Sequence, residues 1–435
     1  MPVLHAYQNA PANRISVIAM VLVFVFNFAN EGLGDEPIPP NPSLKWWKGN
    51  LHTHSLWSDG DDFPEMIAEW YRTHGYHFLA LSDHNTLSQG IKWMGIQEIS
   101  KRGGSNALEK YRKRFGEDWV ETQGEGDELR VRLKPLDEFR YLVEERGRFI
   151  MIPGEEVSDR AEGRPVHMNA TNLLEKIAPV GGETVREAMA NNLRLVKEQE
   201  KKLGRKIMMH LNHPNFGWAV TAEDLAAVYE ERFYEVYNGH PGVNHLGDAE
   251  RPSVERIWDL ANTLRLTTGG PLLYGIGTDD SHDYHGQPGS HTGRGWVMVR
   301  SKYLTPEHLI SALRRGDFYA SSGVYLRDVQ HRSEEGKLIV DVEPQGDEQF
   351  KIQFIGTVIS DQAKSSTAAD VAEANELQGI AIGKVLAEVD GTSGAYRFEG
   401  NELYVRAVVT SSASADDPSF EDQKKQAWTQ PVLVK

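Results

Sequence analysis

Histidine and carboxylate side chains recur along this chain in an ordered series, each near the end of an apolar run. The series consists of His52, His54, Asp59, His84, Glu156, His167, His213, Asp280 and His282. Imidazole nitrogens and carboxylate oxygens are ligands that zinc, manganese and iron accept in proteins, and nine of them suffice for two or three divalent cations. The series therefore predicts a multinuclear metal site with hydrolytic chemistry. Ligand types alone do not distinguish manganese, zinc and iron.

The spacing within the series favours a shared site. His52 and His54 are separated by one residue, as are Asp280 and His282. Residues two apart in a strand point to the same face, so each pair can reach one metal ion. Asp59 lies in a Ser-Asp-Gly sequence, which by itself is more typical of a turn.

Three positions have competing interpretations. Glu155 precedes Glu156, and adjacent strand residues face opposite sides, so only one of the two should face the site; the register favours Glu156. His210 competes with His213 for one ligand position, because the two differ in parity along the same strand. Asp279 is expected at the surface or in a supporting position.

A few charged residues are assigned roles other than metal binding. Asp83 precedes His84 at the end of a short apolar run, and we expect it to orient a ligand rather than to bind metal. Arg294, Arg314 and Arg315 are candidates for binding substrate oxygens. An equally good interpretation makes these arginines solvated surface charges.

Between residues 45 and 323, strand-like segments with polar ends alternate with helical segments. The strand-like segments are 45–55, 77–84, 149–156, 166–173, 206–214, 233–238 and 272–282, and helical segments occur at 64–74, 183–202, 221–230 and 252–264. Such alternation predicts parallel strands joined by right-handed crossovers. Functional groups at strand ends are typical of an α/β barrel, where they converge on one face.

Two regions depart from this alternation. Residues 90–148 are charged and helix-prone, and we expect them to form an insertion near the mouth of the site. From residue 325 to 435, short alternating runs, such as 337–342, 350–359 and 402–409, replace helices and predict a small all-β, sandwich-like domain. Covering the site, dimerisation and carbohydrate binding are all compatible with that domain.

The N-terminus predicts export. Residues 15–29 form an uninterrupted apolar run behind Arg14, and a polar, Pro-rich stretch follows. We interpret residues 1–30 as a signal peptide, or as an N-terminal membrane anchor if they are not cleaved, and residues 31–44 as a linker. The expected location is periplasmic or extracellular. The chain has no cysteine, so disulfides and thiolate ligands are excluded.

Composition and charge narrow the class of partner. Hydrophobic residues make up 40% of the chain and charged residues 25%, which is ordinary for a globular protein. The net charge is −16, from 63 acidic and 47 basic residues, so we expect no strong affinity for nucleic acid. A membrane contact would come only from the N-terminal segment. An anionic small-molecule substrate would be held at the metal ions.

Several short motifs, in a fixed order, resemble a known superfamily. They are Leu-His-Thr-His-Ser, Ser-Asp-Gly, Leu-Ser-Asp-His, Pro-Gly-Glu-Glu, His-Met-Asn-Ala, Asn-His-Pro and Asp-Ser-His. Together they resemble the PHP superfamily, named for polymerase and histidinol phosphatase, over residues 48–323. Gly-Arg-Gly-Trp at 293–296 and the sequence at 314–323 look like the carbaryl-hydrolase-like branch.

The resemblance implies a distorted (β/α)7 barrel with a trinuclear site at the C-terminal ends of its strands, followed here by the all-β domain. It implies one metal held by His52, His54, Glu156 and Asp280, a second held by Glu156, His167 and His213, and a third held by Asp59, His84 and His282. The insertion at 90–148 departs from compact members of the superfamily, and it leaves the choice of substrate open.

The prediction for function is a metal-dependent phosphoesterase that hydrolyses a small phosphate mono- or diester with a metal-activated water. One alternative uses the same site to cleave a carboxyl ester, carbamate or amide. A second alternative is a metal-binding recognition module without catalysis. Few basic residues in the pocket would favour the carboxyl-ester alternative.

Overall fold

The computed structural model describes residues 41–360 and 379–434. The segment predicted as a signal peptide or anchor, residues 1–30, lies outside the described residues, as does most of the predicted linker. Within the described ranges, no helix has the length and apolar character needed to cross a bilayer.

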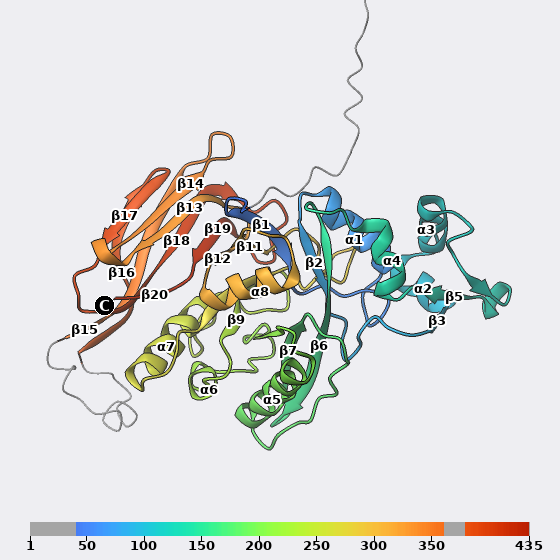
Figure 1. Ribbon diagram of the computed structural model, residues 1–435, viewed down its shortest axis with the longest axis horizontal. Coiled ribbons are helices and arrows are strands. Elements are labelled where there is room, and N and C mark those ends of the chain that lie inside the picture. The colour runs from blue at the N-terminus through green and yellow to red at the C-terminus, as the bar shows by residue number, and fades with distance from the viewer. Residues whose placement is uncertain (1–40, 361–378, 435) are drawn as a thin grey trace, which may run out of the picture. The chain divides into compact units, whose positions relative to one another are not determined.

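One sheet of 14 strands runs through most of the described chain (Figure 1). Its order is β10-β9-β8-β7-β6-β2-β1-β11-β12-β19-β18-β15-β16, with β20 paired to β18. The pairs β1–β2, β2–β6, β8–β9 and β9–β10 are parallel, and the other pairs are antiparallel. The protein is therefore a mixed α/β protein with a partly parallel sheet. The bounds are β1 Lys45–Asn50, β2 Phe78–Leu81, β6 Ile150–Ala161, β7 Arg164–Thr171, β8 Met208–Leu211, β9 Phe233–Asn238, β10 Tyr274–Thr278, β11 Trp296–Ser301, β12 Phe318–Ser321, β15 Phe350–Ile359, β16 Ile380–Asp390, β18 Glu402–Ser414, β19 Lys424–Thr429 and β20 Val432–Leu433.

Strands β6 and β7 form a hairpin, so the expectation of parallel strands throughout is wrong here. Only Glu162 and Gly163 connect them, and both have positive φ, 51° and 75°. A two-residue turn of this backbone conformation matches the twist of hairpin strands. Apolar periodicity identifies a strand but not its direction, and a two-residue connection can join only antiparallel neighbours.

A closed seven-stranded barrel is not confirmed. Among the described strands, β10 pairs along its length with β9 alone. A single bridge between Thr53 and Ser281, just beyond the ends of β1 and β10, links the two strands. It brings the segment that follows β1 beside the segment that follows β10.

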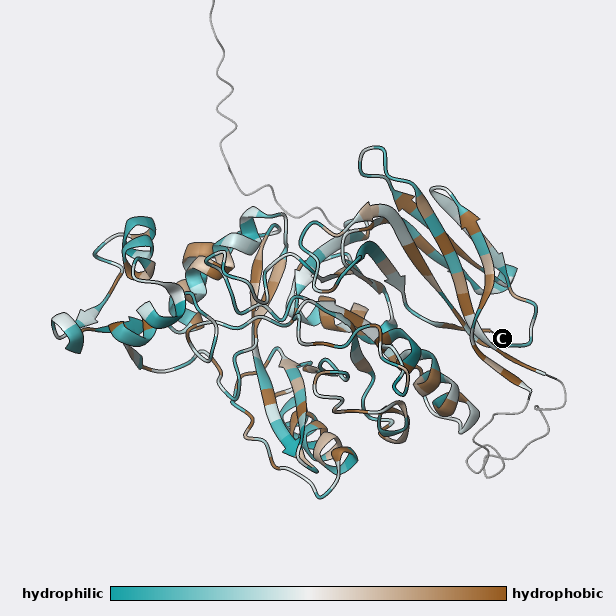
Figure 2. Cartoon of the chain, turned by 180° about the vertical axis from the view of Figure 1, so that it is seen from behind, coloured by the Kyte–Doolittle hydropathy of each residue, from teal (hydrophilic) through white to brown (hydrophobic). Residues whose placement is uncertain are grey.

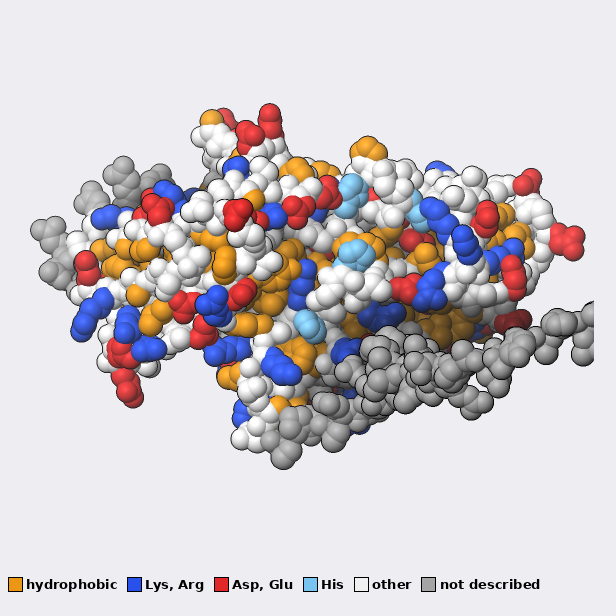
Figure 3. Space-filling model, turned by 90° about the horizontal axis from the view of Figure 1, so that it is seen from above, with side chains coloured by type: hydrophobic (Ala, Val, Ile, Leu, Met, Phe, Trp, Pro, Cys, Tyr) orange, Lys and Arg blue, Asp and Glu red, His pale blue; other side chains and the backbone are white. Residues whose placement is uncertain are grey.

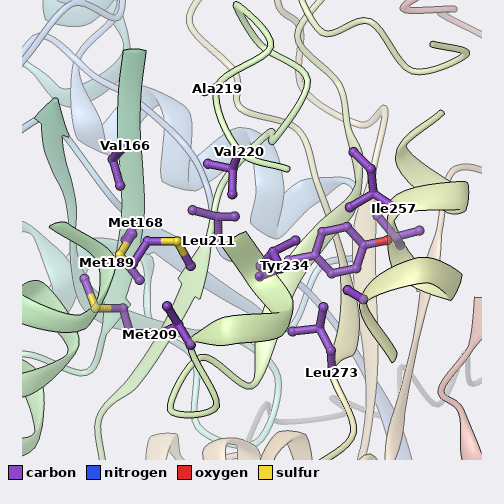
Figure 4. Close-up of a cluster of buried hydrophobic side chains, with 14 of the residues drawn as sticks. Val166, Met168, Met189, Met209, Leu211, Ala219, Val220, Tyr234, Ile257 and Leu273 are labelled. Carbon is purple, nitrogen blue, oxygen red and sulfur yellow. The ribbon is translucent and has the colours of Figure 1, made fainter. Parts of the chain in front are cut away.

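Most of the helices pack their apolar faces against the first half of the sheet. The helices are α1 Pro64–Thr73, α2 Ile96–Gly103, α3 Ala107–Phe115, α4 Leu136–Val143, α5 Val185–Leu203, α6 Ala222–Ala227, α7 Val254–Thr267 and α8 Pro306–Arg315, with 3-10 turns η1 Gly126–Glu128 and η2 Ser333–Glu335. Met189 of α5 meets Met168 of β7 and Met209 of β8, and Ile257 of α7 lies beside Tyr234 of β9 (Figure 4). This buried apolar layer holds β7, β8 and β9 in place beneath the polar strand ends.

The sheet continues into the C-terminal region, because β12 pairs with β19. The strands predicted at 337–342, 350–359 and 402–409 occur as β14, β15 and β18. A second sheet, β13-β14-β17, shares one apolar core with β15 and β18, and brown and teal alternate along these strands in Figure 2. The bounds are β13 Tyr325–Arg332, β14 Lys337–Glu343 and β17 Ser393–Arg397. The described residues after 325 are therefore strands and loops with one 3-10 turn.

The insertion at 90–148 has its own small sheet and core. Strands β3 Lys92–Gly95, β5 Arg130–Leu133 and β4 Thr122–Gln123 form an antiparallel sheet beside α2 and α3. Its core includes Tyr111, whose ring stacks on Phe63 at 3.9 Å, and extends to Trp57. The insertion is therefore packed against the segment that carries Asp59.

Candidate metal centre

All nine predicted ligands converge in one cluster. Glu156 and His167 lie within β6 and β7, and the others lie in the segments that follow β1, β2, β8 and β10. Each belongs to a group of side chains whose ligand atoms lie within 4.8 Å of one another. Several residues belong to two groups, so the nine form one continuous cluster. The groups are His54 with Asp59, His84 and His282; His52 with His54 and Glu156; His52 with His213 and Asp280; and His84 with Glu156 and His167.

Backbone pairing joins the two ligand pairs that follow β1 and β10. The amide of His54 donates to Ser281 O at 2.9 Å, and the amide of Asp280 donates to His52 O at 3.0 Å. Asp280 has a φ of 50°, a left-handed conformation that costs free energy for a residue with a side chain. Strain of this kind persists only where surrounding contacts enforce it, and it is typical of functional sites.

His52, His54 and Asp280 meet at the centre of the cluster. The two Nε2 atoms lie 3.1 Å apart, and they lie 3.1 and 3.2 Å from Asp280 Oδ1. Burial, together with the neighbouring His282, lowers the pKa of His54 to about 3, so its ring is neutral. Burial also lowers the pKa of His52, yet Asp280 and other carboxylates raise it well above its usual value. A positive charge at this point, a proton or a metal ion, stabilises the arrangement.

Glu156 occupies the middle of the cluster and is fully buried. Its Oε1 lies 3.0 Å from His167 Nδ1 and accepts a hydrogen bond from Asn212 at 2.8 Å. Its Oε2 lies 2.6 Å from His84 Nδ1 but accepts no hydrogen bond from the described residues. Burial raises the pKa of Glu156, but His167 and His84 lower it well below its usual value. An ionised, buried oxygen without a donor fits a metal ligand.

Asp59 lies on the exposed side of the cluster. Its Oδ1 is 3.5 Å from both His54 Nδ1 and His282 Nε2, and its Oδ2 is 3.4 Å from His84 Nε2. The Nδ1 of His282 faces the carbonyl of Asp280 at 2.8 Å, so it carries the proton and Nε2 is free to bind. The Ser-Asp-Gly turn therefore delivers a carboxylate to three imidazoles.

The alternative Glu155 points away from the cluster, as the alternation of strand side chains requires. Its Oε2 accepts the amide of Ile177 at 2.9 Å, and burial raises its pKa to about 7. Glu156 is therefore the member of the pair that faces the site.

Glu235 is a buried residue of the site that the sequence interpretation missed. Its Oε1 lies 2.7 Å from His52 Nδ1, and its Oε2 accepts the amide of His213 at 2.8 Å. His210, the competitor of His213, lies 3.4 Å from Glu235 Oε1 and forms a further possible metal group with Glu235 and His52. The available signal was an acidic residue inside the apolar strand Phe-Tyr-Glu-Val-Tyr-Asn.

The cluster holds an excess of negative groups. Its carboxylates are Asp59, Glu156, Glu235 and Asp280, and among the described residues each pairs only with histidines, never with lysine or arginine. Buried carboxylates without a cation are costly. The residues of the cluster therefore fit divalent cations, whose positive charge would balance that of the carboxylates.

Asp83 stays outside the ligand groups and supports the loop that carries Asp59. Its carboxylate accepts the amide and hydroxyl of Ser55, both at 2.8 Å, and the hydroxyl of Ser58 at 2.7 Å. The Ser58 hydroxyl also lies 3.2 Å from Asp59 Oδ1. Asp83 thus fixes the turn, and through it the position of Asp59.

Arg294 is not available to bind substrate, contrary to the expectation. It forms a two-point contact with Asp417, both distances 3.0 Å, and donates to the carbonyls of Gly239 and Gly289 at 2.8 Å. These contacts occupy its donors, and the residue is buried. Arg314 pairs with Glu200 outside the cluster. Asp417 is 123 positions away from Arg294 in the sequence, so the residues around Arg294 do not indicate this pairing.

Arg315, the remaining candidate, pairs with Asp317 on the surface. It matches the alternative interpretation of a solvated charge.

The insertion touches the loop beside the cluster. Lys92 donates to the carbonyl of Trp57, and Arg102 donates to the carbonyl of Ser58. Lys110 lies 3.2 Å from His285 Nδ1 in the loop after His282. The expected place of the insertion, near the mouth of the site, agrees with these contacts.

Comparisons with known proteins give distant structural similarities. No family model and no curated protein matches the chain. A two-domain protein from Bacteroides vulgatus, containing a predicted PHP-like metal-dependent phosphoesterase, is 16% identical with a TM-score of 0.38, over 90% of this chain and 97% of that one. PsfC from Pseudomonas syringae is 12% identical with a TM-score of 0.34, over 62% and 88%. A protein from Bifidobacterium adolescentis, provisionally assigned as a metal-dependent phosphoesterase, is 15% identical with a TM-score of 0.28, over 58% and 92%.

These TM-scores and identities are low, so function has to be inferred from the side chains of the cluster itself.

Proposed function

We propose that this chain is a metal-dependent phosphoesterase of the PHP type, which hydrolyses a small organic phosphate mono- or diester with water as the nucleophile. One observation carries the proposal: nine histidine and carboxylate ligands converge, and no lysine or arginine among the described residues neutralises their charge. The Nε2 atoms of His52 and His54 and the Oδ1 atom of Asp280 lie 3.1 to 3.2 Å from one another, which supports a role in binding cations.

The proposed ligands would hold two or three divalent ions, manganese, zinc or iron. The proposed first site is His52, His54, Glu156 and Asp280; the second is Glu156, His167 and His213; the third is Asp59, His84 and His282. Bound there, divalent ions lower the pKa of water and stabilise the negative charge that develops on ester oxygens. The contacts of Asp59 with His84 and His282 support the third set.

The surrounding residues would hold the ligands in orientation. Glu235 fixes which nitrogen of His52 carries a proton, and Asn212 donates to Glu156. Asp83 holds the turn of Asp59 through Ser55 and Ser58. The bridge between Thr53 and Ser281 supports the proposal that the seven strands form a distorted barrel, because it joins its first and last strands.

Localisation and partners are proposed from sequence. Residues 1–30 would direct export to the periplasm or beyond, or anchor the protein, and they lie outside the described residues. Acidic and basic side chains are interspersed on the face drawn in Figure 3, and the net charge is −16. Both observations support a small-molecule substrate rather than nucleic acid.

A second function is favoured by a specific observation. The three candidate arginines, Arg294, Arg314 and Arg315, pair with Asp417, Glu200 and Asp317, which leaves none of them free to neutralise a phosphate. A carboxyl ester, carbamate or amide carries less charge and needs no such cation. The same ligands would then polarise a carbonyl group. Binding without catalysis is the least supported function, because the ligand set is complete.

Hydrolysis of matched chromogenic esters tests the proposal. p-Nitrophenyl phosphate, bis(p-nitrophenyl) phosphate and p-nitrophenyl acetate would be compared, using protein lacking residues 1–30, with and without manganese or zinc. Metal-dependent cleavage of a phosphate ester that is lost in Glu156→Gln supports the phosphoesterase. Cleavage of the acetate alone supports the carboxyl-ester function. Inertness toward all three by a protein that retains its metal would argue for recognition without catalysis.

A further inference from the structure

The cluster is bordered by an additional histidine, His240, which belongs to none of its possible metal groups. It lies in the loop after β9, and its ring centroid is 5.8 Å from that of His282. Phe216 stands edge-on to His240 at 5.5 Å and lies 5.1 Å from the ring of His213. Two proposed ligands therefore flank the position of His240.

Contacts with the loop determine which nitrogen of His240 carries the proton. The amide of Gly242 donates to His240 Nδ1 at 2.9 Å. An imidazole nitrogen that accepts a hydrogen bond has no proton, so in the neutral ring Nε2 carries it.

The Nε2–H of His240 has no partner in the described part of the protein. Buried polar atoms are normally satisfied, and this one is not among the fully buried unpaired atoms, so solvent can reach it. His240 thus presents a solvent-accessible donor on a ring whose centroid lies 5.8 Å from that of His282.

The backbone of His240 is anchored on two sides. Its amide donates to Asn238 Oδ1 at 2.8 Å, and Asn238 in turn donates to Asp280 Oδ2 at 3.0 Å. The preceding carbonyl, of Gly239, accepts from Arg294, which Asp417 of the C-terminal region holds in place. The position of His240 is therefore set both by the cluster and by the loop between β18 and β19, which carries Asp417.

Close packing leaves little room for the ring to move. A Cβ at Gly242 would lie 2.9 Å from His240 Cε1 and 3.0 Å from Nδ1. Only glycine permits the amide of residue 242 to approach the ring in this way. The orientation of the ring is thus specified by the loop sequence His-Pro-Gly.

We propose that His240 is a substrate-binding residue, whose Nε2–H donates a hydrogen bond to an oxygen of the ester held at the metal centre. The inference rests on the proposed function, since it presumes an ester at that centre. It gives a neutral donor the task for which Arg294, Arg314 and Arg315 were the candidates from sequence. A neutral N–H is sufficient to bind one charged ester oxygen, because a hydrogen bond is strong when only the acceptor carries a charge.

The test compares three substitutions that differ in the donor they leave. His240→Ala removes the donor, His240→Asn leaves an amide too short to reach the position of Nε2, and His240→Gln places an amide N–H near it. His74→Ala, which removes an exposed imidazole just after α1, is the matched control. The readouts are metal content, the affinity of the manganese-loaded protein for inorganic phosphate by calorimetry, and kcat and KM for the best chromogenic ester.

The expected result is full metal content in every variant, with phosphate affinity and kcat/KM reduced roughly 10- to 100-fold in His240→Ala and His240→Asn and largely restored in His240→Gln. The inference is overturned if His240→Ala binds phosphate as tightly as the wild type does. It is also overturned if His240→Ala loses its metal, or if the wild type binds no phosphate. If the wild type binds phosphate through His240 but cleaves no phosphate ester, the phosphoesterase proposal fails, and what stands is the hydrogen bond from His240 to an oxygen of the bound ligand.

Discussion

Two buried charged regions of the molecule are organised in opposite ways. Where α7 meets β18, Asp259 receives two hydrogen bonds from Arg406, at 2.9 and 2.8 Å, and one from Tyr404 at 2.6 Å. In the metal-ligand cluster, Glu156 and Asp280 are also buried but are surrounded by histidines. The first region is neutralised by the chain itself, and the second is not.

The difference separates a structural contact from a binding site. A carboxylate paired with an arginine has its charge and its hydrogen bonds satisfied, so it requires nothing from solution. A carboxylate such as Glu156, with an oxygen that lacks a donor, requires a cation or a proton. The cluster is therefore expected to bind metal ions, whereas the contact between α7 and β18 is expected to be unaffected by them.

The largest expected effect is on Glu156→Gln. This substitution preserves shape but removes the charge shared by several groups of the cluster, so bound metal should fall and hydrolysis should drop by more than about 100-fold, beyond what the loss of an orienting residue costs. Metal content per chain and kcat/KM measure the effect. A glutamine variant with full metal and full activity would place the functional centre elsewhere.

Arg406→Ala should affect stability without affecting the cluster. It leaves Asp259 buried and unpaired, which costs about 3 to 5 kcal/mol in the free energy of unfolding. Denaturant unfolding measures the loss, and metal content of the folded protein should stay the same. Lys351→Ala is the control: its pair with Glu388 is exposed, so stability should hardly change. A loss of metal in Arg406→Ala would contradict the independence of the two regions.

Glu235→Gln should weaken metal binding without abolishing it. Glu235 orients His52 from outside the nine ligands, and removal of such a partner typically reduces metal affinity about 10- to 100-fold. Competition with a chelator measures the affinity. Glu230→Gln, an exposed change nearby, serves as the control, and equal affinities in the two variants would show that Glu235 has no such role.

The smallest effect concerns Glu402, a buried carboxylate satisfied by chain donors. It accepts from the Tyr396 hydroxyl and from the amides of Glu399, Gly400 and Asn401. Burial raises its pKa, but these hydrogen bonds lower it below its usual 4.5. Glu402→Gln should cost about 1 to 2 kcal/mol at neutral pH.

The pH dependence of that difference has a definite sign. Because the folded state binds the proton of Glu402 less tightly than the unfolded state, its stabilising contribution is present above the usual pKa. It is lost as pH falls through the lower folded pKa. Unfolding at pH 7 and at about pH 3 measures this, and a constant difference between wild type and variant would mean that the charge of Glu402 is irrelevant.

Local patterns predicted much of the fold and nearly all of the cluster. Strand β15 begins and ends where the alternating run 350–359 does, and α1 starts at Pro64, the first residue of the predicted helical segment 64–74. The His-x-His spacing and the choice of Glu156 over Glu155 follow from the alternation of strand side chains. These features depend on neighbours within a few residues.

Nonlocal partners account for what was missed. Arg294 has its partner Asp417 more than a hundred positions away, and Glu235 meets His52 from another strand. The continuation of the sheet through β12 and β19 joins segments equally remote in sequence. No local pattern carries such information.

The sequence by itself determined which groups are present, in which order, and on which face of each strand they lie, because side-chain parity is a local property of the backbone. Only the tertiary structure decided which of these groups lie close enough to bind the same cation or to form an ion pair. A carboxylate becomes a ligand or half of an ion pair according to what lies within about 4 Å of it, and for Glu156 and Asp259 that neighbourhood is assembled from strands and helices distant in sequence.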